Sequence, residues 1–149
     1  MGGSSTVACG KPPGRSGVNS TNGYLLDSHG LLWWWFEPQR LSHTVASLLQ
    51  DSRTTVYVSA ASVWELSLKH HLGRLPQLAG AIGDLEPLLK ADGFRPLAIT
   101  PAHGLRAGAY SQAHRDPFDR MLAAQAELEQ LVLLTIDTQL AAFPCQILW

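Results

Sequence analysis

Two hydrophobic patterns alternate along the chain from position 24 onward. Short runs such as Tyr24-Leu25-Leu26 and Val56-Tyr57-Val58 are rich in leucine, aromatic or β-branched residues, which is typical of buried strands. Longer segments between such runs carry apolar residues at helical spacing, for example positions 41, 45, 48 and 49. This alternation predicts an α/β fold with three layers, α/β/α, in which helices cover both faces of a central parallel sheet.

The same pattern gives approximate bounds for the elements and indicates a sheet of about four to five strands. The strands are expected at about 23–27, 56–58, 94–99, 131–135 and 146–148. Pro96 suggests that the 94–99 strand lies at an edge of the sheet or that the proline stands at its start, because proline cannot donate to a strand ladder. Helical segments are expected at about 31–36, 41–49, 61–72, 78–91, 101–108, 116–130 and 138–142.

Residues 1–22 differ in composition from the rest of the chain. They are rich in glycine, serine, proline and threonine and almost free of large apolar groups. Such a segment buries too little surface to offset its chain entropy. We therefore expect 1–22 to be a disordered extension or a cloning remnant, followed by a single domain at 23–149.

Overall composition excludes several classes of protein. The 11 Lys and Arg residues nearly balance the 12 Asp and Glu residues, so there is no bulk basic charge for nucleic acid. Two cysteines, Cys9 and Cys145, do not make a disulfide framework. No stretch reaches the roughly 18 apolar residues of a membrane span, and no apolar secretory signal is present. A cytoplasmic protein without a membrane partner is expected.

Four acidic residues stand where a predicted strand ends or a predicted helix begins: Asp27, Glu65, Asp119 and Asp137. Because parallel α/β sheets bind ligands at the carboxyl ends of their strands, acids far apart in sequence can meet in one pocket. A cluster of carboxylates is unfavourable unless a cation neutralises it. Oxygen ligands suit Mg²⁺ or Mn²⁺. The pattern thus indicates a metal-dependent enzyme acting on a phosphodiester.

Three of these acids also have a purely structural interpretation. Asp27 and Asp137 stand where a helix N-cap would accept hydrogen bonds from the first free N–H groups. Glu65 has the spacing of a capping box with Ser62, unless Ser59 is the cap. No one of these positions decides between a cap and a catalytic acid, and the argument for function rests on their agreement at one edge of the sheet.

The segment Asp116-Pro117-Phe118-Asp119 has the composition of a helix start, with aspartate at the N-cap and proline at the first helical position. This favours a structural role for Asp116. Small residues follow Asp119 at positions 123 and 124, which allows this helix to lie close to the sheet and bring its first turn to the strand ends.

Three consecutive tryptophans at 33–35 cannot share one face of a helix. We expect one or two of them to pack in the core and at least one to meet solvent or a partner, where it would mark an interface. Trp64 and Leu68 form a further apolar pair at i,i+4.

Several motifs in the same order along the chain resemble the PIN-domain ribonucleases of the VapC toxin type. The resemblance runs from about Tyr24 to Trp149 and departs from that family in residues 1–22. It is carried by Leu25-Leu26-Asp27-Ser28-His29 with Leu32-Trp33-Trp34, by 59–65 (SAASVWE), by 114–126 (HRDPFDRMLAAQA), by Thr135-Ile136-Asp137, and by the closing Ile147-Leu148-Trp149.

This resemblance implies a PIN-like domain whose acid pocket binds Mg²⁺, with Mn²⁺ able to substitute, and cuts single-stranded RNA to leave a 5′-phosphate and a 3′-hydroxyl. Family members are usually homodimers held inactive by a small VapB-like antitoxin that fills the catalytic groove. The expected function is therefore a metal-dependent endoribonuclease, the toxin of a type II toxin–antitoxin module. The resemblance assigns the catalytic, metal-binding acids to Asp27, Glu65, Asp119 and Asp137.

Five further residues are expected to support this site. Ser28 and Thr135 are expected to orient the acids by hydrogen bonding, and Asp116 to stand near the metal. Because an acid pocket alone repels RNA, we assign phosphate contacts to Arg115 and Arg120. Arg120 has an equal alternative, an ion pair with Asp116 at i,i+4.

Two other functions remain open from the sequence. In one, the acids are only helix caps and the tryptophan cluster binds a protein partner, which makes the domain a non-catalytic interaction module. In the other, the same pocket acts on DNA. There is no P-loop or G-x-G-x-x-G motif, so a nucleotide cofactor is not expected, and the six histidines show no zinc spacing with cysteine.

Overall fold

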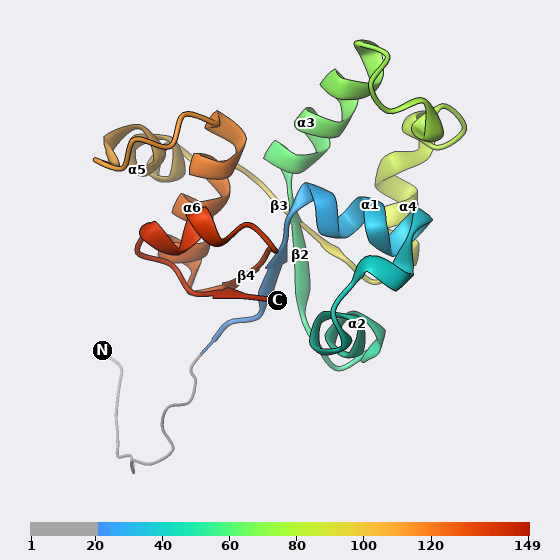
Figure 1. The fold of residues 1–149 in the computed structure, drawn as a ribbon, viewed down its shortest axis with the longest axis horizontal. Coiled ribbons are helices and arrows are strands. Elements are labelled where there is room, and N and C mark those ends of the chain that lie inside the picture. Colours follow the sequence, from blue (N-terminus) through green and yellow to red (C-terminus); the bar gives the residue numbers. More distant parts are fainter. Residues whose placement is uncertain (1–20) are drawn as a thin grey trace.

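A parallel sheet forms the centre of the computed structural model, which describes residues 21–149 (Figure 1). In spatial order its strands are β3-β2-β1-β4-β5, and every neighbouring pair is parallel. The predicted parallel sheet is confirmed, and β3, which contains Pro96, lies at its edge. The strand bounds are β1 (Tyr24–Leu26), β2 (Val56–Ser59), β3 (Arg95–Leu97), β4 (Val132–Leu134) and β5 (Ile147–Leu148).

Helices cover both faces of the sheet, as the three-layer prediction requires (Figure 1). One face carries α1 (Ser28–Phe36), α2 (His43–Gln50) and α4 (Leu85–Ala91), whereas α5 (Pro101–Ala109) and α6 (Pro117–Glu129) lie on the other. Helix α3 (Ala60–His71) follows β2 directly and extends beyond the carboxyl end of the strand. Four short 3₁₀ helices complete the described chain: η2 (Pro38–Arg40), η3 (Pro76–Leu78), η4 (Ile82–Asp84) and η5 (Thr138–Ala142).

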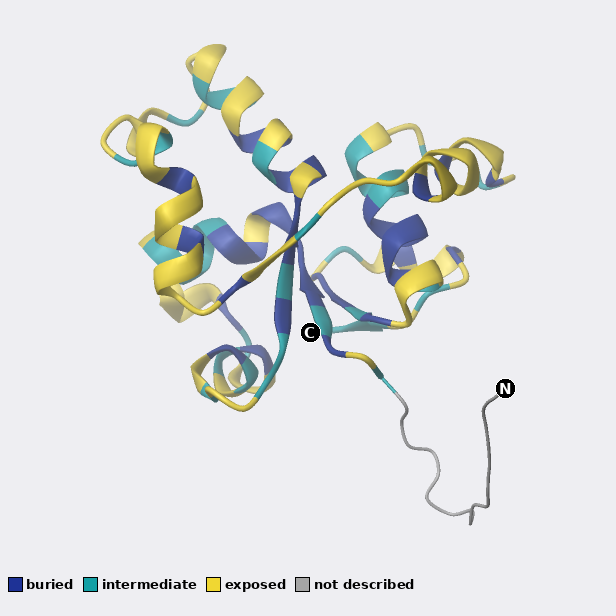
Figure 2. Ribbon diagram, turned by 180° about the vertical axis from the view of Figure 1, so that it is seen from behind, coloured by how far each residue is buried: buried dark blue, intermediate teal, exposed yellow. Residues whose placement is uncertain are grey.

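Neighbouring residues of one strand contribute to two separate cores. Leu26 and Leu134 pack with α1, α2 and α4, while Leu25 and Leu133 pack with α5 and α6. All four are fully buried. Because successive side chains of a strand point to opposite faces, a continuous run of apolar residues marks a strand covered on both sides. Figure 2 shows the resulting buried centre and the exposed outer faces of the helices.

The segment predicted as one helix over 78–91 is divided in the structure. Its first part forms η3 and η4, and α4 begins only at Leu85. Apolar residues at Leu78, Leu85 and Leu89 are buried at helical intervals, which explains the prediction. Glycines at 80 and 83 interrupt that pattern and disfavour a continuous helix because glycine loses more backbone entropy than other residues.

The predicted extension at 1–22, including Cys9, lies almost entirely outside the described residues. Its last two residues, Thr21 and Asn22, are described and contact the end of α6. The Asn22 N–H donates to the Gln130 carbonyl at 2.9 Å, and its side-chain amide donates to the Glu129 carbonyl at 3.0 Å. Thr21 and Asn22, which the prediction placed in the extension, therefore contact the domain.

The three tryptophans of α1 are all half-buried. The indole N–H groups of Trp34 and Trp35 both donate to Asp92 Oδ2, at 3.2 and 2.7 Å, and the Trp33 ring meets Trp149 edge-on at 5.5 Å between centroids. The most exposed tryptophan side chain in the described residues is instead Trp64, at 59%. No helix within 21–149 is both long and apolar enough to cross a bilayer.

Candidate metal-dependent active site

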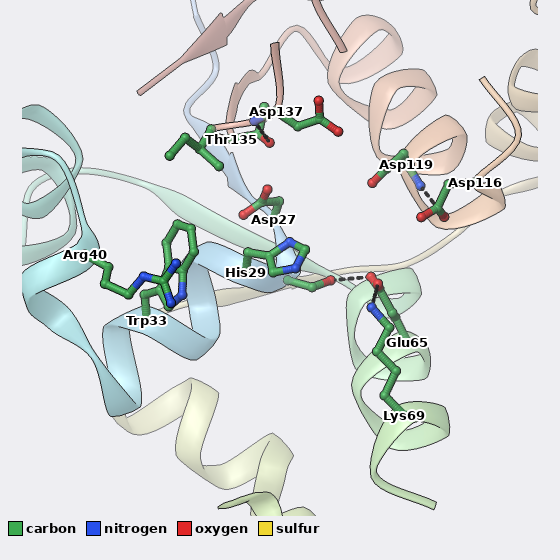
Figure 3. Close-up of a pocket in the computed structure, with 12 residues that line it drawn as sticks. Asp27, His29, Trp33, Arg40, Glu65, Lys69, Asp116, Asp119, Thr135 and Asp137 are labelled. Atoms are coloured by element: carbon green, nitrogen blue, oxygen red, sulfur yellow. Dashed lines mark hydrogen bonds and ion pairs between the residues drawn. The ribbon is translucent and has the colours of Figure 1, made fainter. Parts of the chain in front are cut away.

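The four acids predicted for catalysis line one cavity of about 400 Å³ at the carboxyl ends of the strands (Figure 3). They reach it from four places in the fold: the end of β1, the second turn of α3, the first turn of α6 and the loop after β4. Ser28, Thr135 and Asp116 line the same cavity, as do the basic residues Arg40 and Lys69. Five carboxylates against two basic side chains make this the acidic side of the domain.

Asp27 lies between the end of β1 and the start of α1 and is 7% exposed. Its Oδ1 accepts a hydrogen bond from the Gly30 N–H at 2.8 Å, so it caps α1 while it lines the cavity. A Cβ at Gly30 would lie 2.6 Å from Leu26 Cδ1 and 3.0 Å from Asp27 Oδ1, so a side chain at this position would have to displace the buried Leu26. Burial raises the pKa of Asp27, and hydrogen bonds from Thr135 and Gly30 only partly offset that rise.

Glu65 is held at both carboxylate oxygens. Its Oε1 accepts from the Ser28 hydroxyl at 2.6 Å, and its Oε2 pairs with the Lys69 ammonium at 2.6 Å (Figure 3). The N-cap of α3 is Ser59, whose side chain accepts from the Ala61 N–H, so the capping box with Ser62 does not form. Glu65 is thus a buried carboxylate fixed by side chains from two helices, and capping does not explain it.

Asp119 lies in the first turn of α6 and accepts a hydrogen bond at Oδ2 from a ring nitrogen of His114, Nε2, at 2.8 Å. Burial raises the pKa of Asp119; the His114 hydrogen bond opposes this effect, and the charges of Asp116 and Glu65 add to it. Asp116 is the N-cap of α6, and its Oδ1 accepts from the Phe118 N–H at 2.9 Å. Both acids of this turn line the cavity.

Asp137 follows β4 and is half-buried. Its backbone N–H donates to the Thr135 hydroxyl at 3.1 Å, and its Oδ1 accepts from the Gln139 N–H at 2.9 Å at the start of η5. Asp27, Asp116 and Asp137 are therefore helix caps and cavity acids at the same time. The two interpretations left open by the sequence do not exclude each other, because a cap engages one carboxylate oxygen.

Arg120 does not line the acid cavity, and its hydrogen bonds within the domain are with main-chain atoms. Its guanidinium donates to four backbone carbonyls, those of Ala107, Tyr110, Gln112 and His114, at 2.7–3.0 Å. With these four hydrogen bonds inside the domain, the guanidinium makes no ion pair with Asp116, the alternative that the i,i+4 spacing offered. Arg120 fixes the chain between α5 and α6, a role with no signal in the sequence because the partners are main-chain atoms.

Two basic residues near the acids, Lys69 and Arg40, were not predicted from the sequence. The Lys69 pair with Glu65 has i,i+4 spacing on a helix and was therefore available as a signal. The Arg40 guanidinium lies 4.6 Å from the centroid of the Trp33 ring, and its Nη1 pairs with Glu37 at 3.1 Å. Arg115 is exposed and does not line the cavity.

The donor set of the cavity fits a hard divalent cation. Carboxylate and hydroxyl oxygens are the ligands that Mg²⁺ and Mn²⁺ prefer. Within the described residues, one ring nitrogen of His114 and one carboxylate oxygen each of Asp119 and Asp137 lie within 4.8 Å of one another. Burial also raises the pKa of both Asp27 and Asp119, which means that their ionised forms are destabilised. A cation bound beside them would stabilise the two negative charges.

Comparison with known proteins identifies the family of the chain. The PIN domain matches residues 24–144 of the chain. Ribonuclease VapC22 of Mycobacterium tuberculosis (strain ATCC 25618 / H37Rv) is 33% identical over 117 residues, which covers 78% of this chain and 88% of that protein. Ribonuclease VapC16 of the same organism is 32% identical over 57 residues, covering 38% of this chain and 40% of that protein.

Solved structures agree at the level of the fold. VapBC2 from Rickettsia felis, bound to a DNA fragment from its promoter, has a TM-score of 0.62 at 13% identity and covers 85% of this chain and 98% of that one. DNA-bound VapBC from Salmonella typhimurium has a TM-score of 0.61 at 16% identity, covering 85% and 96%. The chain belongs to the PIN domain family. Its 33% sequence identity with VapC22, over most of both chains, places it with the VapC type.

Proposed function

We propose that this protein is a divalent-metal-dependent endoribonuclease that cleaves single-stranded RNA and acts in the cytoplasm. The observation that carries the proposal is the meeting of four acids from separate elements in one cavity at the carboxyl ends of the strands. Membership of the PIN domain family and identity to a protein named as a ribonuclease support the same activity.

The residues that line the cavity have different proposed roles. Asp27, Asp119 and Asp137 would hold the cation, and Glu65 would complete the cluster. A bound Mg²⁺ or Mn²⁺ would supply positive charge against the phosphate and acidify the attacking water. Ser28 fixes Glu65 at 2.6 Å, and Thr135 fixes the backbone of Asp137 at 3.1 Å, so the acids are oriented before substrate arrives.

The test is cleavage of a total-RNA pool by antitoxin-free protein in Mg²⁺, in Mn²⁺ and in EDTA. We expect cuts in both metals, none in EDTA, and products with 5′-phosphate ends. Cleavage that persists in EDTA would remove the metal from the proposal. Absence of cuts in every arm, from protein with a cooperative thermal transition, would favour the non-catalytic interaction module.

RNA phosphates require basic contacts beside the acids, and we assign these to Arg40 and Lys69, with Arg115 at the exposed start of α6. Arg40→Gln is expected to weaken binding of a labelled single-stranded RNA. Each lost phosphate contact should make the plot of log affinity against log salt less steep by about 0.7. Fluorescence anisotropy in EDTA across a KCl series measures both quantities.

A matched control for Arg40 is Arg53→Gln. Arg53 is an exposed arginine that pairs with Asp51 just before β2, at the opposite end of the sheet from the cavity. Equal losses of affinity and slope in the two variants would show that the effect is general charge and not a contact at the cavity.

We further propose that the protein is the toxin of a VapBC-like module and assembles with a small VapB-like antitoxin. The solved relatives support this, because the VapBC structures and FitAB bound to an IR36 DNA fragment are complexes. The FitAB chain has a TM-score of 0.57 at 23% identity and covers 84% of this chain. An antitoxin that fills the acid cavity would block both the metal site and the RNA contacts.

A homodimer is the second proposed assembly, and its contact surface is an apolar stripe on α3. Trp64, Leu68 and Leu72 are spaced four apart on one helix face and are 59%, 40% and 56% exposed. Phe118 extends the stripe by packing edge-on against Trp64 at 4.8 Å. Contiguous exposed apolar side chains of this kind are typical of protein interfaces.

Leu68→Glu is expected to convert a homodimer into a monomer, because it buries a charge in that contact. Sedimentation velocity of antitoxin-free protein over a concentration series measures the change. Leu128→Glu provides the control, since Leu128 is similarly exposed, at 43%, but lies near the end of α6. A wild-type monomer at high concentration would contradict the proposal.

A further inference from the structure

We propose that His114 supplies a nitrogen ligand to the metal centre and makes the site prefer Mn²⁺ over Mg²⁺. This inference rests on the proposed function, because it assumes that the acid cavity binds a divalent cation. It adds a ligand of a different chemical class to the four acids.

The geometry places His114 within the acid cluster. Its Nε2 lies 2.8 Å from Asp119 Oδ2. A ring nitrogen of His114 and single carboxylate oxygens of Asp119 and Asp137 lie within 4.8 Å of one another, a spacing at which three ligand atoms can share one ion. The three residues come from three places in the chain: the segment before α6, the first turn of α6 and the loop after β4.

The imidazole is held in place by the surrounding fold. The His114 side chain is only 16% exposed, and its ring packs edge-on against Phe143 at 5.9 Å with an interplanar angle of 88°. The His114 carbonyl accepts a hydrogen bond from Arg120 Nη1 at 3.0 Å. A ring that packs against an aromatic side chain, and whose backbone is held by a half-buried arginine, loses little further freedom when it binds a ligand.

A mixed ligand set changes which ion the cavity selects. Mg²⁺ is bound by carboxylate oxygens and water and gains little from imidazole, whereas imidazole suits the later divalent metals. Mn²⁺ accepts both kinds of ligand and stands below Fe²⁺, Co²⁺ and Ni²⁺ in affinity for a given nitrogen and oxygen site. An added nitrogen therefore raises affinity for Mn²⁺ more than for Mg²⁺.

The alternative is that His114 only donates a hydrogen bond to Asp119 and orients that carboxylate. Pulsed electron paramagnetic resonance of bound Mn²⁺ separates the two roles, because a coordinated imidazole produces electron-spin-echo modulation from ¹⁴N and an orienting histidine in the outer sphere does not give the same coupling. The sample is the tag-free, antitoxin-free full chain with substoichiometric Mn²⁺.

We expect ¹⁴N modulation in the wild type, its loss in His114→Gln and its retention in His29→Gln. The His29 control is needed because His29, unlike His114, is a lining residue of the cavity and offers a second imidazole near the acids. In parallel, calorimetric titration should show Mn²⁺ affinity falling about tenfold or more in His114→Gln, with a smaller fall for Mg²⁺. Circular dichroism melts confirm that each variant is folded.

The outcomes separate this inference from the proposed function. Two results would overturn the ligand role of His114: tight Mn²⁺ binding without ¹⁴N modulation in the wild type, or modulation that persists in His114→Gln. Neither result contradicts the proposed metal-dependent nuclease. Failure of the folded wild-type protein to bind either ion overturns both. Equal falls in Mn²⁺ and Mg²⁺ affinity for His114→Gln overturn the claim of selectivity.

Discussion

Asp27→Asn is expected to abolish metal-dependent RNA cleavage while making the metal-free protein more stable than the wild type at neutral pH. The loss of activity should be at least about 10³-fold, the scale on which single electrostatic groups act in catalytic sites. It follows from the position of Asp27, which lies 7% exposed at the end of β1 among the other acids. Asparagine keeps the shape of the side chain but removes the negative charge that holds a cation.

The gain in stability follows from the pKa of the same carboxyl. Burial raises the pKa of Asp27 above its value in the unfolded chain. A raised folded pKa stabilises the protein fully below the unfolded pKa of about 3.9, and that contribution is lost as pH rises through the folded pKa. Asparagine does not ionise and escapes this loss. It also keeps the cap, because its Oδ1 can accept from the Gly30 N–H as Asp27 does at 2.8 Å.

Thermal melts in EDTA at pH values from 4 to 8 measure this second effect. The curves of wild type and Asp27→Asn should converge near pH 4 and separate as pH rises, with the variant higher. Asp84→Asn is the control: Asp84 is exposed and makes no side-chain cap contact, so both its activity and its stability should match the wild type. A variant that melts well below the wild type at pH 7 would indicate that Asp27 serves the fold more than the metal.

Arg120→Met is expected to destabilise the fold by about 3 kcal/mol, because hydrogen bonds from charged donors contribute roughly 1.5–3 kcal/mol each and do not add fully. Methionine retains the apolar stem but leaves four carbonyls of the 107–114 segment without their donor. For a domain of this size, the melting temperature should fall by roughly 10 °C. Chemical denaturation monitored by tryptophan fluorescence measures the change in the free energy of unfolding.

Arg115→Met is the matched control for Arg120→Met. Arg115 is exposed, and substitutions at such sites usually change stability by less than about 0.5 kcal/mol. Its variant should melt like the wild type and affect RNA binding alone. An Arg120→Met protein with unchanged stability and lost RNA affinity would restore the phosphate contact that the sequence suggested.

The sequence predicted the sheet and the four acids because both depend on local patterns. Strands covered on two faces are continuous apolar runs, and the acids follow those runs or begin the next helix, so chain order alone brings them to one edge. The predicted start of α4 was wrong because apolar periodicity continues through a segment in which Gly80 and Gly83 disfavour a continuous helix. The spacing of apolar residues indicates which positions are buried but does not include the backbone preferences of glycine.

Roles that depend on main-chain partners or on packing between distant segments were not predictable. Three of the four carbonyls bound by Arg120 follow α5, in a segment whose path no residue pattern fixes, and the fourth belongs to Ala107 within α5. His114 depends on Phe143 and Asp137, which come from elements that meet it only in the folded chain. Arg40 reaches the cavity because it lies over the Trp33 ring, an arrangement that needs the positions of α1 and η2 together.

The two ends of the described chain lie at opposite ends of the parallel strands. Thr21 and Asn22 approach β1 from its amino end, where they contact the end of α6. Trp149 follows β5 at the carboxyl edge and packs against Trp33, which lines the acid cavity. A reporter or affinity handle attached at Thr21 therefore emerges far from the acid cavity, whereas one attached at Trp149 emerges beside it and would obstruct the proposed antitoxin and RNA contacts.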